Sequence, residues 1–157
     1  MINRGLMSLA ELDELHSRMC SVIRRHGGCV GDVLYCPHRP EENCPCRKPQ
    51  PGLLLRAKHQ LGVDLAAAIV VGDHVTDLEA ARRAGCRSLL VSSGRLTEGL
   101  RDGLPDGCVG AVPDLMAAAE RIVADCASGP SSTERWLASV PSEWTPGRGS
   151  TPAVAVV

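Results

Sequence analysis

A chain of 157 residues with a formal net charge of −1 has the length of one domain, and it lacks the basic surplus that is typical of proteins binding nucleic acids or anionic membranes. No apolar run approaches the roughly 20 residues that a membrane span needs, and the first residues lack the apolar core of a signal peptide. We therefore expect a cytoplasmic protein that binds neither nucleic acid nor membrane. The sequence predicts no particular oligomeric state.

Short apolar runs alternate with stretches of helical periodicity along most of the chain. The first of these stretches opens with Ser8 and Glu11, which form the pattern of a capping box. Later stretches end at glycines, and Asp114 is placed to cap the last one. The predicted elements, in chain order, are a helix at 7–26, a strand at 30–35, a loop at 37–51, a helix at 52–61, a strand at 68–71, a helix at 76–84, strands at 88–91 and 109–112, and a helix at 115–125.

This alternation is typical of an α/β fold with a parallel sheet. In such folds ligands bind at the carboxyl ends of the strands, so the corners at 72–73 and 92–94 are the candidate positions for a site. From residue 127 onward Ser, Pro, Gly and Thr dominate the composition. We therefore expect one domain at 1–126 and a disordered tail at 127–157.

The predicted loop at 37–51 and the residue before it hold four candidate metal ligands: Cys36, His38, Cys44 and Cys46. Three thiolates and one imidazole are a regular ligand set of structural zinc. In a reducing compartment, a cysteine cluster indicates a metal more often than disulfides. Four ligands from one loop leave no position open for water, so we expect a structural zinc ion. The alternative is a chance cluster of free thiols.

Two charged groups lie near this loop and near the corner at 72–73. Arg47 and Lys48 follow the last candidate ligand directly, and both can bind phosphate. Asp73 follows a predicted strand, where a carboxylate can hold Mg²⁺. Asp77 could orient a loop amide, a metal-bound water or Lys48. The alternatives are a solvated basic loop and a plain helix cap.

Three segments in this order carry a resemblance: CPH, CPCRKPQPG and VGDHVTDLEAARRAG. They closely resemble the D-glycero-D-manno-heptose 1,7-bisphosphate 7-phosphatases of the HAD superfamily, and also the related histidinol-phosphate phosphatases. The resemblance runs from about Ile2 to about Ala124, and the cysteine loop is its most specific part. It implies a HAD-like Rossmannoid parallel sheet flanked by helices, with a zinc-binding loop.

The resemblance also implies roles for the charged residues. Lys48 would steady the transferred phosphoryl group, Arg47 would contact a small sugar phosphate substrate, and Asp73 would bind Mg²⁺. The four residues of the cysteine loop would bind structural zinc.

The family uses an aspartate nucleophile and an acid–base aspartate, separated by one residue on its first strand. No two aspartates of this chain stand in that spacing. We therefore expect a truncated sheet that misses its first strands, has unpaired edges and shows no phosphatase activity. A start codon assigned too late or a degraded gene would explain this. The alternative functions are a histidinol-phosphate phosphatase and a non-catalytic zinc-binding interaction module.

Overall fold

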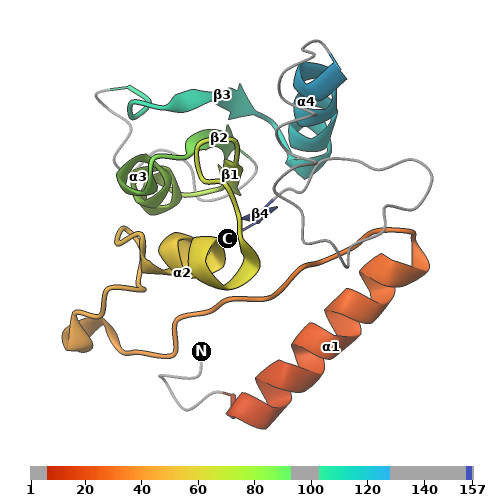
Figure 1. The fold of residues 1–157 in the computed structure, drawn as a ribbon, viewed down its shortest axis with the longest axis vertical. Coiled ribbons are helices and arrows are strands. Elements are labelled where there is room, and N and C mark those ends of the chain that lie inside the picture. The colour runs from red at the N-terminus through yellow and green to blue at the C-terminus, as the bar shows by residue number, and fades with distance from the viewer. Residues whose placement is uncertain (1–6, 93–102, 128–154, 157) are drawn as a thin grey trace.

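The computed structural model describes residues 7–92, 103–127 and 155–156. None of the helices in these ranges is long and apolar enough to cross a membrane. The elements (Figure 1) are α1 (Leu9–Arg25), the 3₁₀ turn η2 (Pro40–Glu42), α2 (Gly52–Leu61), β1 (Ile69–Gly72), α3 (Val75–Ala84), β2 (Arg87–Val91), β3 (Cys108–Val112), α4 (Leu115–Ala127) and β4 (Ala155–Val156).

The strands form one parallel sheet in the order β3-β2-β1-β4. Every residue of β1 is buried, and so is every residue of β2 except Arg87. Continuous buried apolar runs are typical of parallel sheets covered on both faces. The predicted α/β class, a parallel sheet flanked by helices, is confirmed.

The core lies in two layers, one on each face of the sheet, because successive side chains of a strand point to opposite faces. Val70 of β1 packs with α2 and α3, whereas Val71 of the same strand packs with α4. The buried residues of the first layer are Leu54, Leu65, Val70, Ala80, Ala81 and Cys86. Those of the second layer are Ile69, Val71, Leu89, Val91, Ala118 and Ile122.

The helix ends follow the capping signals in the sequence. Ser8 and Glu11 form the expected capping box at the start of α1. The carboxylate of Asp114 accepts the N–H of Ala117 at 2.8 Å, as expected for the start of α4. Gly85 ends α3 with φ 76°, a left-handed conformation that glycine adopts without steric cost.

The predicted strand at 30–35 is wrong. These residues form an irregular connection between α1 and the cysteine loop (orange in Figure 1). A strand needs a neighbour that pairs with its backbone, and no described strand lies beside this segment. Its apolar residues Val33 and Leu34 are instead half-buried in the connection.

We expected unpaired edges in the sheet, but the edge of β1 that faces away from β2 carries β4. Val70 pairs with Ala155 and Val71 with Val156, both in parallel. Of the tail predicted at 127–157, the structure describes Ala127, which ends α4, and the two residues of β4. The rest of the tail and the corner residues 93–94 lie outside the described residues, so the domain boundary stays a prediction.

Candidate phosphate and metal site

The cysteine loop brings its four candidate ligands together. The three Sγ atoms of Cys36, Cys44 and Cys46 lie 3.2 to 3.4 Å apart. Nδ1 of His38 lies 3.2 Å from Sγ of Cys46 and 3.7 Å from that of Cys36. All four ligand atoms lie within 4.8 Å of one another. A tetrahedral zinc site with Zn–S bonds of about 2.3 Å has edges of about 3.8 Å, so the donor set fits a zinc ion after a small expansion.

Local backbone structure holds this loop against α2. The turn η2 ends at Asn43, whose φ of 47° turns the chain back toward Cys44. The N–H of Gly52 donates to the carbonyl of Pro45 at 2.9 Å, which joins the loop to the start of α2. A Cβ atom on Gly52 would collide with the backbone of Pro45, so a glycine is needed at this contact.

The thiols influence one another's ionisation. Burial raises the pKa of Cys44, but hydrogen bonds with Cys36, Cys46 and nearby backbone N–H groups outweigh burial and lower it to about 7. Burial, together with hydrogen bonds to Cys36 and Cys44 and their charges, raises the pKa of Cys46 to about 12. The Cys46 thiol therefore does not ionise near neutral pH without a cation, and a metal ion held by these residues would supply that charge.

The ammonium of Lys48 forms an ion pair with a buried carboxylate of α3. Nζ of Lys48 is 2.6 Å from Oδ1 of Asp77, whose side chain is only 2% exposed. Oδ2 of Asp77 accepts the backbone N–H groups of Asp73 and His74, each at 3.2 Å. Asp77 therefore joins the end of the cysteine loop to the corner after β1. Of the roles considered for Asp77, the structure shows contacts with the loop amides and with Lys48.

Gly72 makes room for this carboxylate. A Cβ atom at Gly72 would lie 2.6 Å from Oδ2 and 2.7 Å from Cγ of Asp77, closer than real Cβ contacts. The Gly-Asp pair at the end of β1 thus has two local functions. The glycine admits the Asp77 side chain, and Asp73 donates its backbone N–H to it.

Asp73, the candidate magnesium ligand, is exposed at the carboxyl end of β1. Its backbone N–H and the Lys48 ammonium contact the two oxygens of the same Asp77 carboxylate. The candidate magnesium and phosphate residues are therefore neighbours, as parallel-sheet geometry predicts. That Asp73 binds Mg²⁺ stays a prediction.

Arg47 is turned toward the cysteine loop. Its Nη2 donates to the backbone carbonyl of His38. Its Nε is buried and has no partner among the described residues. Arg47 nonetheless lines the same depression as Lys48. That Arg47 contacts substrate stays a prediction.

This depression has a volume of about 360 Å³, and its two hydroxyl-bearing lining residues, Tyr35 and Thr76, were not among our sequence candidates. Tyr35 is the only tyrosine of the chain and directly precedes Cys36. Thr76 lies between Asp73 and Asp77, and its hydroxyl is 3.0 Å from Nδ1 of His74, which caps α3. The position of Tyr35 beside the metal-ligand pattern was the signal that could have identified it.

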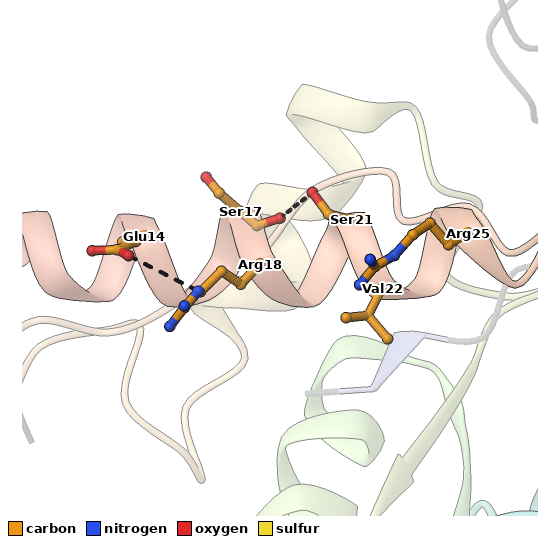
Figure 2. Close-up of a pocket in the computed structure, with 6 residues that line it drawn as sticks. All are labelled: Glu14, Ser17, Arg18, Ser21, Val22 and Arg25. Carbon is orange, nitrogen blue, oxygen red and sulfur yellow. Dashed lines mark hydrogen bonds and ion pairs between the residues drawn. The ribbon is translucent and has the colours of Figure 1, made fainter.

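A second depression of about 420 Å³ runs along α1 (Figure 2). It is lined by residues of that helix, among them Glu14 and Arg18, which form an exposed ion pair at 3.9 Å. None of the candidate site residues lies there. The contacts of Lys48, Asp73 and Asp77 lie instead at the carboxyl end of β1.

The sequence and the fold match known proteins. The profile of the HAD-hydrolase-like family matches residues 45–118. The D-glycero-beta-D-manno-heptose-1,7-bisphosphate 7-phosphatase of Pseudomonas aeruginosa is 41% identical over 122 residues, which cover 78% of this chain and 68% of that protein. The protein of the same name from Bordetella bronchiseptica is 40% identical over 121 residues, covering 76% of this chain and 67% of that protein.

A crystal structure gives the same result. The D,D-heptose 1,7-bisphosphate phosphatase from B. bronchiseptica, complexed with magnesium and phosphate, superimposes with a TM-score of 0.71 at 38% identity. The match covers 79% of this chain and 69% of that structure. The chain therefore belongs to the D-glycero-D-manno-heptose 1,7-bisphosphate 7-phosphatase family of the HAD superfamily.

Proposed function

We propose that this chain carries the magnesium- and phosphate-binding part of a phosphatase site for a sugar bisphosphate, namely the 7-phosphate of D-glycero-D-manno-heptose 1,7-bisphosphate. One observation carries the proposal. The Lys48 ammonium is held 2.6 Å from a buried carboxylate whose other oxygen binds the backbone of Asp73. The relatives named as heptose bisphosphate phosphatases support the substrate class.

The Lys48 side chain supplies a fixed positive charge for a phosphate. It is about one-third exposed and lines the depression, so a ligand bound there can contact it. A charge held in place before the ligand arrives stabilises negative charge better than a mobile one. Lys48 is therefore the residue through which this chain would hold the transferred phosphoryl group.

Asp73 would hold Mg²⁺ beside that phosphate. Its exposed carboxylate at the end of β1 is a ligand that Mg²⁺ accepts together with waters and phosphate oxygens. When bound, the ion would neutralise charge on the phosphate. The structure of the B. bronchiseptica relative contains magnesium and phosphate, which supports this cofactor.

A zinc ion bound by Cys36, His38, Cys44 and Cys46 would have a structural role. The four ligands saturate a tetrahedral ion, so no position remains for substrate or water. Because Arg47 and Lys48 follow Cys46 directly, the metal would fix the backbone from which both cations extend.

We propose that the 157-residue chain binds its ligand without hydrolysing it. The family resemblance implies a nucleophile and an acid–base group on two aspartates separated by one residue, and no two aspartates of these 157 residues have that spacing. Without such a pair, the covalent route has neither a group to accept the phosphoryl nor one to protonate the leaving oxygen.

Calorimetry on the zinc-loaded chain tests this function. We expect inorganic phosphate to bind with Mg²⁺ present, and Lys48→Met to weaken binding about 10- to 100-fold, the usual effect of losing a charged hydrogen bond. Lys58→Met, on the exposed side of α2, is the matched control and should change little. Equal phosphate affinity in the unmodified chain and in Lys48→Met would refute the proposed site. Release of phosphate from the heptose bisphosphate would refute the proposed lack of turnover.

The missing aspartate pair also favours a second candidate, a zinc-binding interaction module without a ligand site. The same experiment separates the two. The module predicts about one zinc ion per chain and no phosphate binding.

A further inference from the structure

Two residues that line the depression beside Lys48, Tyr35 and Thr76, take no part in the proposed phosphate binding. The depression's volume of about 360 Å³ exceeds what a phosphate ion needs and lies within the usual range for small-molecule sites. Arg47 and Lys48 supply its positive charge, and Tyr35 and Thr76 supply neutral hydroxyl groups. The site can therefore contact more of a ligand than its phosphate.

Tyr35 is held from two sides. Its neighbour Cys36 belongs to the cluster of four candidate metal ligands, and a bound ion would anchor its backbone. Its ring packs against the ring of His16 of α1, with centroids 5.6 Å apart and planes inclined by 51°. A side chain with a fixed backbone and a packed ring loses little freedom when a ligand binds, which favours affinity. The contact also gives a local role to α1, a helix with no buried residue.

The side chain of Tyr35 suits contact with the polyhydroxylated ring of a sugar. A tyrosine offers an apolar ring face and a hydroxyl that donates or accepts hydrogen bonds. A sugar ring presents C–H groups to the former and hydroxyl groups to the latter. A ligand carrying an ammonium group would instead lie near two cations, Arg47 and Lys48, and would be repelled.

We propose that Tyr35 is a specificity-determining residue that contacts the sugar ring of a ligand whose phosphate lies at Lys48. This inference rests on the proposed function. The phosphate is then held by charge, and the sugar is distinguished by the tyrosine. Tyr35 contributes to the affinity for the sugar bisphosphate and not to that for inorganic phosphate.

Two probes on the zinc-loaded chain with Mg²⁺ test this inference: inorganic phosphate and D-glycero-D-manno-heptose 1,7-bisphosphate. We expect Tyr35→Phe to weaken the binding of the sugar bisphosphate about 3- to 10-fold, which is the effect of losing one neutral hydrogen bond. Tyr35→Ala should weaken it more than tenfold. Neither variant should change phosphate affinity more than about twofold. Zinc content shows whether each variant keeps its loop, and Tyr35→Phe keeps the ring if Tyr35→Ala does not fold.

The outcomes distinguish this inference from the function on which it rests. If the Tyr35 variants bind both probes more weakly by the same factor, Tyr35 supports the loop and does not contact the sugar. If neither probe weakens, or if the unmodified chain binds both probes equally, the tyrosine does not determine specificity, while the phosphate site stands. If the unmodified chain binds neither probe, the proposed function fails, and this inference fails with it.

Discussion

At the scale of single residues, Asp77 is the centre of the site. Its carboxylate is buried and contacts one cation and two backbone N–H groups. We expect Asp77→Asn to lower the free energy of unfolding by about 1–3 kcal/mol. Removing one partner of a fully buried pair costs about 3–5 kcal/mol, but the Lys48 side chain is 34% exposed and water compensates part of the loss. Urea unfolding measures the change.

The ion pair of Arg121 and Asp125 in α4 provides the control. Both side chains are about half exposed, at 49% and 47%, and the groups lie 3.2 Å apart. Asp125→Asn should therefore cost less than about 0.5 kcal/mol. Equal losses in the two variants would show that Asp77 is an ordinary surface partner of Lys48.

Gly72 gives a second test at this scale. Because an added Cβ would overlap the Asp77 side chain, Gly72→Ala should displace that carboxylate from Lys48. We expect a loss of about 1–3 kcal/mol in unfolding free energy, as for other overpacked sites, together with weaker phosphate binding by calorimetry. Gly31→Ala has open space around it and should change both quantities little. A stable Gly72→Ala variant with normal phosphate affinity would contradict this account of the corner.

At the scale of elements, the cysteine loop is the segment that a metal should hold. We expect about one zinc ion per chain, with three sulfur ligands at about 2.3 Å and one nitrogen at about 2.0 Å by X-ray absorption. Cys44→Ser should lower the zinc content well below one. Cys108→Ser lies outside the cluster and should leave it unchanged. Oxygen ligands in the spectrum, or full zinc in Cys44→Ser, would contradict this ligand set.

Elements with a local signal were predictable from the sequence, and those that depend on a distant partner were not. The capping box at Ser8 and the cap at Asp114 are local patterns, and both caps form as expected. The second helix begins at Leu115 as predicted, whereas the first begins at Leu9, two residues after its predicted start. The run at 30–35 has the composition of a strand, but composition does not show whether a neighbouring strand exists. The local pattern therefore predicted a strand at 30–35 that does not form.

The same distinction applies to the site. The four cysteine-loop residues are close in sequence, so their spacing predicted their cluster. The contact between Lys48 and Asp77 was one of several options that the sequence left open, since it depends on how the loop lies on α3. Tyr35 and Thr76 come together only through the fold, and no local pattern links them.

At the scale of the whole molecule, the edge of β1 depends on β4 for its backbone partners. Within the described ranges, Ala155 and Val156 make this pairing. We expect a chain ending at residue 154 to expose the edge of β1 and to self-associate, as unpaired edges do. Faster amide exchange at Val70 or Val71 and a larger size by light scattering would report this. Val156→Thr keeps the backbone pairing and should behave like the unmodified chain, and a monomeric truncated chain with unchanged exchange would contradict the role of β4.

The central claim is that a metal-braced loop presents Lys48 to phosphate beside the Asp73 corner. Calorimetric titration of phosphate with Mg²⁺ into the chain before and after zinc removal tests it most directly. We expect zinc removal to weaken phosphate binding at least about tenfold, because the loop that positions Lys48 loses its anchor. Equal affinity in the two forms would show that the loop and the phosphate site are independent.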